Sequence, residues 1–139
     1  MPGYLLDTNV VSELRKPRPH GGVLAWLREV ADSDLNVSAV TLAEIQAGVE
    51  ITREQDAQKA GPIEQWLDQV AQTYNVLPMD AAVFRAWARL MHRRSDTLYE
   101  DGMIAATAKV HGLTVVTRNA ADFTPFGVDL LDPFASRRR

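Results

Sequence analysis

The chain has 139 residues, a formal net charge of −3, a hydrophobic content of 46% and no cysteine. This length suits a single domain, and the absence of cysteine excludes disulfides, thiolate catalysis, cysteine-ligated zinc and iron–sulfur clusters. The acidic balance at first sight disfavours a nucleic-acid partner, because proteins that bind nucleic acids usually carry a basic surface.

We expect one domain over residues 1–139, with a flexible basic tail at 136–139. The segment 1–7 lacks the basic region of a signal peptide. No apolar run approaches the roughly 18 residues that a membrane-spanning helix needs. These features predict a cytoplasmic protein without a membrane partner.

The chain begins with an apolar run at 4–7, which predicts a buried strand that ends on Asp7. A short helix is expected at 9–16, and it should end before Pro17, because proline disrupts a helix interior. The spacing of apolar residues then predicts an amphipathic helix over 23–30.

A second strand is expected at 35–39, followed by a helix over 41–51 that begins at Thr41. Thr41 and Glu44 match a capping box, in which the hydroxyl of the first residue and the carboxylate three residues later bond to backbone N–H groups. This pattern offers a purely structural explanation for Glu44.

Pro62 is expected as the first residue of the next helix, whose apolar stripe runs from 63 to 74. The stripe is typical of core packing. A third strand at 76–79 precedes Asp80, the expected N-cap of an amphipathic helix that ends near residue 91.

The last part of the chain predicts a helix over 101–111 that ends at Gly112, then strands at 114–117 and 128–131. Short apolar strands that alternate with helices indicate an α/β fold, a three-layer sandwich with a mainly parallel sheet of about five strands. Ligands of such sheets bind beyond the carboxyl ends of the strands.

Acidic residues recur at those strand ends or in the helices next to them: Asp7, Glu44, Asp101 and Asp122. Each acid alone has a structural explanation as a cap or a turn residue. Two carboxylates about 5 Å apart, however, repel by roughly 3 kcal/mol at an effective dielectric near 20. If the sheet brings the four together, they form an oxygen-rich site suited to Mg²⁺ or Mn²⁺.

Four motifs come in a fixed order along the chain: LLDTNVVSEL at 5–14, VSAVTLAEIQAGV at 37–49, DGMIAATA at 101–108 and TVVTRNAADF at 114–123. The chain closely resembles PIN-domain ribonucleases, and within them the VapC-type toxins of bacterial toxin–antitoxin pairs. Glu100 departs from the family pattern, in which the corresponding position is commonly small or apolar, and Asp101 keeps the register of the motif.

The resemblance implies a PIN-like fold and metal-dependent endonucleolytic cleavage of RNA, with Mg²⁺ as the cofactor and Mn²⁺ as a substitute. The site residues that it implies are Asp7, Glu44, Asp101, Thr117 and either Asp122 or Asn119. The first three acids and Asp122 would bind the metal, and Thr117 would orient an acid. The acidic balance is then the mark of a metal site and no argument against RNA.

The resemblance also implies a cognate antitoxin, a homodimer and a larger hetero-oligomer with the antitoxin on operator DNA. Two other functions remain open. One is a phosphohydrolase with Asp7 as its nucleophile, although such enzymes usually carry a second aspartate where Asn9 stands. The other is a non-catalytic regulatory module that acts through a DNA-binding partner.

Basic residues form two further groups. Arg85, Arg89 and Arg93 recur every four residues, with Arg94 beside them. This ridge suits contacts with RNA phosphates or a solvated helix face. The tail 137–139 consists of three arginines and allows the same two interpretations.

Overall fold

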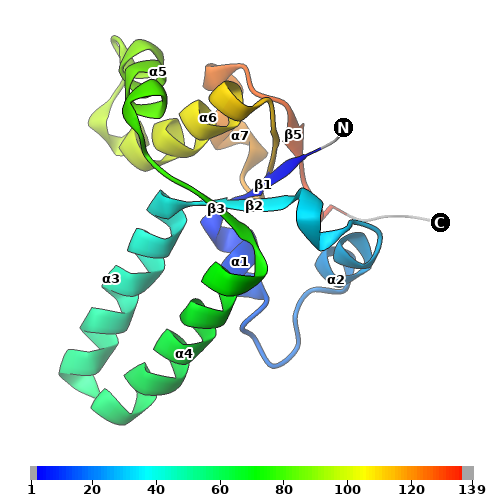
Figure 1. Ribbon diagram of the computed structural model, residues 1–139, viewed down its shortest axis with the longest axis vertical. Coiled ribbons are helices and arrows are strands. Elements are labelled where there is room, and N and C mark those ends of the chain that lie inside the picture. Colours follow the sequence, from blue (N-terminus) through cyan, green and yellow to red (C-terminus); the bar gives the residue numbers. More distant parts are fainter. Residues whose placement is uncertain (1–2, 136–139) are drawn as a thin grey trace.

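The computed structural model describes residues 3–135 and contains a five-stranded parallel sheet in the order β3-β2-β1-β4-β5 (Figure 1). The strands are β1 (Tyr4–Leu6), β2 (Leu35–Ser38), β3 (Asn75–Leu77), β4 (Thr114–Val116) and β5 (Leu130–Leu131). The expected α/β class and the five strands are confirmed, and each strand is up to two residues shorter than expected.

The helices are α1 (Thr8–Glu13), α2 (Gly21–Arg28), α3 (Ala39–Gln55), α4 (Ala57–Thr73), α5 (Ala81–Met91), α6 (Tyr99–His111) and α7 (Ala120–Phe123). Short 3-10 turns lie at Asp32–Asp34, Asp96–Leu98 and Thr124–Phe126. Among residues 3–135, none of these helices is long and apolar enough to cross a membrane.

The strand order reverses at β1, which lies between β2 and β4 at the centre of the sheet. Leu6 of β1 pairs with Val116 of β4, so the residues that follow these strands, Asp7 and Thr117, leave the sheet side by side. In parallel α/β sheets this reversal point is where ligands bind. The topology therefore places two of the expected site residues at the switch point.

The core has two layers because successive strand residues face opposite sides of the sheet. Leu6 and Val116 pack with residues of α1, α2 and α4, whereas Leu5 and Val115 pack with residues of α6 and α7. Figure 1 shows the same division, with α5, α6 and α7 on one side of the sheet and the other helices on the opposite side.

The helices α3 and α4 form a long hairpin that projects away from the sheet (Figure 1). The expected start of the first helix at Thr41 is wrong, because Ser38 caps α3 by accepting the N–H of Val40 at 3.0 Å. The expected start at Pro62 is also wrong. Asp56, six residues before Pro62, caps α4, and Pro62 lies inside the helix.

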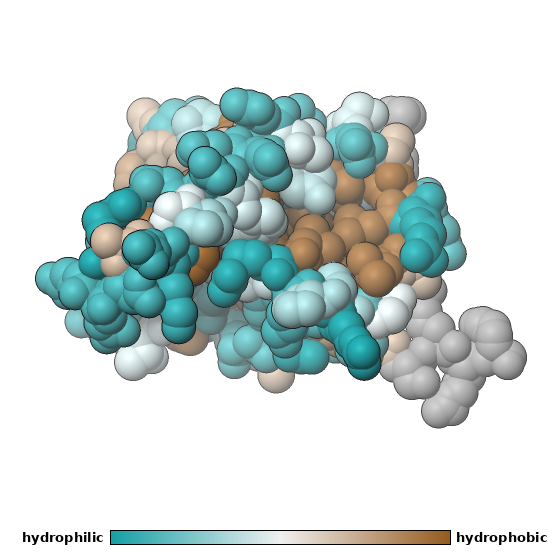
Figure 2. All heavy atoms as spheres, turned by 90° about the horizontal axis from the view of Figure 1, so that it is seen from below, coloured by the Kyte–Doolittle hydropathy of each residue, from teal (hydrophilic) through white to brown (hydrophobic). Residues whose placement is uncertain are grey.

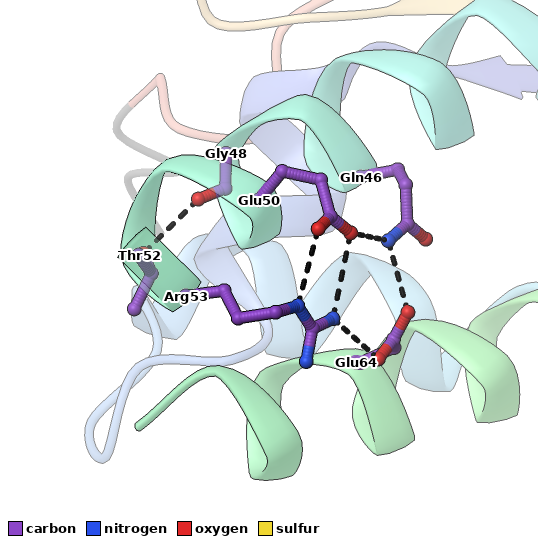
Figure 3. A network of polar contacts seen from close by, with 6 residues as sticks. All are labelled: Gln46, Gly48, Glu50, Thr52, Arg53 and Glu64. Atoms are coloured by element: carbon purple, nitrogen blue, oxygen red, sulfur yellow. Dashed lines mark hydrogen bonds and ion pairs between the residues drawn. The ribbon is translucent and has the colours of Figure 1, made fainter. Parts of the chain in front are cut away.

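Polar side chains join the two arms of this hairpin (Figure 3). Arg53 of α3 donates to Glu64 of α4 at 2.7 Å and to Glu50 of its own helix at 3.1 Å. Gln46 donates to the same two carboxylates, at 2.9 Å and 2.7 Å. Because the two ion pairs of Arg53 are exposed, each contributes little to stability on its own. Glu64 is the residue of α4 that both Arg53 and Gln46 of α3 contact.

Two other expectations need correction. The helix expected at 9–16 ends at Glu13, and a loop leads to Pro17. The arginine ridge is not continuous, because α5 ends at Met91 and Arg93 adopts a left-handed conformation with φ 64°. Arg94 lies 5.2 Å from the ring of Phe126 and donates to backbone oxygens, so it has a structural role.

The caps expected at Asp80 and Gly112 are confirmed. Asp80 accepts the N–H of Val83 at 3.0 Å, and Gly112 ends α6 in the left-handed conformation with φ 66°. The basic tail 136–139 lies outside the described residues. On the underside of the molecule, hydrophilic residues cover the hairpin, and hydrophobic residues gather on the side towards α2 (Figure 2).

Candidate active site

Asp7 is the centre of the site and follows β1 directly. Its backbone N–H continues the sheet by donating to the oxygen of Val116 at 2.9 Å, and its side chain caps α1 by accepting the N–H of Thr8 at 2.8 Å. The second carboxylate oxygen accepts the hydroxyl of Thr117, also at 2.8 Å. Asp7 is only 6% exposed, so the carboxylate is held in one orientation.

Asn9 links the two strand ends. Its amide nitrogen lies 3.3 Å from Asp7 Oδ2 and 3.4 Å from Thr117 Oγ1, and its oxygen accepts the N–H of Arg118 at 3.2 Å. Thr117 Oγ1 also accepts the backbone N–H of Asn119 at 2.9 Å. Asn9 thus offers an amide donor where a phosphohydrolase would offer a second carboxylate, and nothing else favours that alternative.

Glu44 lies on the second turn of α3 and points back towards β1. Its carboxylate accepts a hydrogen bond from the hydroxyl of Thr8, and that hydroxyl lies 3.1 Å from the hydroxyl of Thr41. The capping box expected for Thr41 and Glu44 is wrong, since Ser38 caps the helix. The side chain of Glu44 is therefore free to serve the site.

Asp101 lies in the first turn of α6, and Asp122 lies in α7. The charges of Asp7 and Asp122 both act on Asp101, and the charge of Asp122 acts on Asp7. Asp101 is half-buried, whereas its neighbour Glu100 is exposed and faces Glu44. The acids expected at the strand ends and in the neighbouring helices therefore share one electrostatic environment.

The pKa values of three acids reflect this crowding. Burial raises the pKa of Asp7, although hydrogen bonds from Thr117 and Thr8 act in the opposite direction. Burial and the neighbouring Glu100 carboxyl raise the pKa of Glu44. Burial and the charges of Asp7 and Asp122 raise the pKa of Asp101 to about 6. Each shift means that negative charge at this edge of the sheet is costly without a cation.

The donor set fits a hard divalent cation such as Mg²⁺ or Mn²⁺, which prefers carboxylate oxygens. Within residues 3–135, no three acidic or histidine side chains already stand close enough to hold one ion together. Asp7, Glu44 and Asp101 would hold such an ion, and its positive charge would offset the burial and repulsion that raise their pKa values.

Thr117 and Asp7 are in direct contact. Glu44 is linked to Asp7 through Thr8, whose hydroxyl bonds to Glu44 and whose N–H bonds to Asp7. Asp101 interacts with Asp7 and with Asp122 through their charges. Asn119 contacts the site through its backbone N–H, which donates to Thr117 Oγ1. Sequence reasoning missed the roles of Thr8 and Asn9. The signal that identifies them is position, because they are the first two residues after Asp7, the acid that follows a buried strand.

The comparisons with known proteins agree with this fold. A family model described as PIN domain matches residues 4–124. Toxin FitB of Neisseria gonorrhoeae is 34% identical over 137 residues, which cover 94% of this chain and 97% of that protein. VapC ribonuclease Y4jK of Sinorhizobium fredii is 36% identical over 141 residues, which cover 94% of this chain and 96% of that protein. A solved structure of FitAB bound to a DNA fragment has a TM-score of 0.83 and 32% identity, and the match covers 97% of this chain and 98% of that one.

Proposed function

The chain belongs to the PIN-domain family, and from this premise we propose that it is a metal-dependent endoribonuclease that acts as the toxin of a toxin–antitoxin pair. The observation that carries the proposal is the fixed carboxylate of Asp7, held by Thr117 and Thr8 amid further acids. The similarity to a VapC ribonuclease supports nuclease activity, and the acidic donor set supports the metal.

Asp7, Glu44, Asp101 and Asp122 would hold Mg²⁺, or Mn²⁺ in its place. When bound, such an ion polarises the phosphate and lowers the pKa of water, so that no serine or histidine nucleophile is needed. Asp122 is favoured over Asn119 as the fourth ligand, because its charge acts on both Asp7 and Asp101 and the Asn119 contact to the site is a backbone one.

The residues around these acids would position them. Thr117 and Asn9 donate to the same oxygen of Asp7, which leaves its other oxygen facing the N–H of Thr8. The hydroxyl of Thr8 fixes Glu44 from the opposite side. Partners of this kind hold ligating carboxylates in the geometry that a metal requires.

We further propose that a cognate antitoxin neutralises the protein and that the two act in the cytoplasm, as a homodimer of the toxin within a larger assembly on operator DNA. The similarity to Toxin FitB and to FitAB bound to DNA supports this assignment. The hydrophobic area on the underside is the kind of surface that a protein partner covers (Figure 2). A single PIN domain would span residues 1–139.

The test is cleavage of total RNA by the purified wild type and by Asp7→Asn, each with Mg²⁺ and with EDTA. Wild type is expected to cleave only with Mg²⁺, and Asp7→Asn is expected to lose cleavage while its circular dichroism spectrum is unchanged. Asp68→Asn is the matched control, because Asp68 is an exposed aspartate on α4.

Full cleavage by Asp7→Asn would refute the assignment of the site. Equal RNA binding without any cleavage under Mg²⁺, Mn²⁺ or EDTA would favour the non-catalytic regulatory module instead. These two outcomes are distinct, because the first concerns the residue and the second concerns the activity itself.

A further inference from the structure

A groove begins at the candidate active site and runs between α1 and the α3–α4 hairpin. Thr8 and Glu44, both in contact with each other at the site, line its inner end. The groove encloses about 510 Å³ and continues into a second hollow of about 710 Å³, and Arg15, Thr52 and Ile63 line both. A ligand in the groove would therefore reach the acids directly.

The groove is basic although the chain as a whole is acidic. Its charged lining consists of Arg15, Lys16, Lys59 and the single carboxylate of Glu44 at the inner end. Arg15 and Lys59 are exposed, and Lys16 remains 57% exposed although it bonds to Glu13 at 2.9 Å. The groove that leads to the active site is therefore lined mainly by positively charged side chains, although the whole chain has a net charge of −3.

The floor of the groove is apolar. Half-buried Trp66 and Ile63 of α4 line it, together with Ile45 of α3. A row of cations beside an aromatic ring is how proteins hold a single-stranded nucleic acid, because the cations meet phosphates and the ring stacks on a base. A duplex is disfavoured, since its bases are paired and cannot turn towards the floor.

We propose that this groove binds the single-stranded RNA substrate, with Arg15, Lys16 and Lys59 at its phosphates and Trp66 against a base, and leads the strand to Glu44 and Asp7. The proposal rests on the proposed ribonuclease function and adds where the substrate lies. It also assigns the phosphate contacts to this side of the sheet and not to Arg85 and Arg89 of α5.

Binding is measured by fluorescence anisotropy with a fluorescein-labelled single-stranded RNA oligonucleotide in EDTA, so that nothing is cleaved. Arg15→Gln and Lys59→Gln are each expected to weaken binding about three- to tenfold, as for the loss of one charge-assisted contact. In a plot of log K, the association constant for the RNA, against the logarithm of the salt concentration, the slope is expected to become less steep by about 0.7 for each cation removed. The double variant should combine both effects.

Arg85→Gln is the matched control, because it removes one exposed positive charge from α5 on the other side of the sheet. It is expected to change affinity less than twofold. Trp66→Leu is expected to weaken binding without changing the salt dependence, and Trp66→Phe is expected to retain most of the affinity. This pair separates stacking from charge.

The proposal is overturned if the wild type does not bind the oligonucleotide, if the Arg15 and Lys59 variants bind within twofold of wild type, or if Arg85→Gln weakens binding equally. Unchanged RNA binding together with a weakened complex with the antitoxin would assign the groove to that protein instead. Absence of RNA cleavage by wild type with Mg²⁺ would contradict the proposed function alone, since the binding measurement requires no metal.

Discussion

The hydroxyl of Thr117 donates to Oδ2 of Asp7 across 2.8 Å and joins two side chains that are 110 positions apart in the sequence. Both residues directly follow central parallel strands, and Thr117 is fully buried. A hydrogen bond to a buried carboxylate favours its charged form, so Thr117 opposes the effect of burial on the pKa of Asp7.

Thr117→Val is expected to weaken Mn²⁺ binding about ten- to 100-fold, the usual effect of removing a residue that orients a metal ligand. Valine has nearly the shape of threonine, so the fold should persist, while the hydroxyl that donates to Asp7 and accepts the N–H of Asn119 is lost. Titration calorimetry measures the metal affinity without reference to RNA cleavage. Thr117→Ser restores the hydroxyl and is expected to bind Mn²⁺ nearly as wild type does; an equal loss in both variants would contradict this role.

Thr8→Val tests the other side of the site. Its hydroxyl bonds to Glu44, while its backbone N–H, which the substitution leaves in place, bonds to Asp7. We expect at least a tenfold loss of cleavage rate, because Glu44 loses the donor that fixes its orientation. Thr8→Ser should retain most of the rate. If the valine variant cleaved as fast as wild type, Glu44 would not depend on Thr8.

The fold was predictable where local patterns decide it. Strands such as β1 and β4 are short buried runs between turns, and Gly112 ends α6 in a conformation that glycine adopts easily. The site was predictable as far as parallel strands bring their ends together, which is why Asp7 and Thr117 meet.

Tertiary contacts decided what the sequence patterns missed. Thr41 and Glu44 have capping-box spacing, but the bond that Glu44 makes is to Thr8, 36 positions away. Pro62 is a different case, because it looked like a helix start although the cap lies six residues earlier, at Asp56, which accepts the N–H of Gln58 at 3.1 Å. For Glu44, contact with a distant element overrides a local preference.

Glu13, which lies outside the candidate metal site, is expected to make the stability of the fold depend on pH. Its side chain is 6% exposed, bonds to Lys16 at 2.9 Å and accepts the N–H of His20 at 2.8 Å. The hydrogen bond from Lys16 is the main reason that the pKa of Glu13 lies below its ordinary value of 4.5. A carboxyl with a lowered folded pKa stabilises the fold above its unfolded pKa, and this contribution is lost as the pH falls through the folded pKa.

Glu13→Gln is therefore expected to unfold at a lower temperature than wild type at pH 7, and the difference should shrink as the pH falls below about 4.5 and through the lowered pKa of the folded state. Thermal melts in EDTA, followed by circular dichroism, measure it. Glu54→Gln is the control, because Glu54 is exposed. It should match wild type throughout; a constant deficit of Glu13→Gln at every pH would mean that its charge is not the cause.

Two adjacent glycines at the start of α2 give the sharpest prediction of stability. A Cβ added to Gly22 would lie 2.5 Å from the backbone oxygen of Pro133 and 3.1 Å from the ring of His20, whereas a Cβ on Gly21 would meet nothing within 4 Å. The ring of His20 also accepts the N–H of Gly22 at 3.0 Å and packs 5.2 Å from the ring of Phe134. The segment after β5 is therefore fitted closely against this turn.

Gly22→Ala is expected to lower the free energy of unfolding by about 1–3 kcal/mol, the usual cost of forcing an atom into a filled space. Gly21→Ala should raise it by up to about 1 kcal/mol, because alanine favours a helix where there is room. Urea denaturation of both variants measures the difference. Since the obstructing atom belongs to the backbone of Pro133, a side-chain rotation cannot relieve the clash, and equal stability of the two variants would mean that the segment after β5 does not pack on α2.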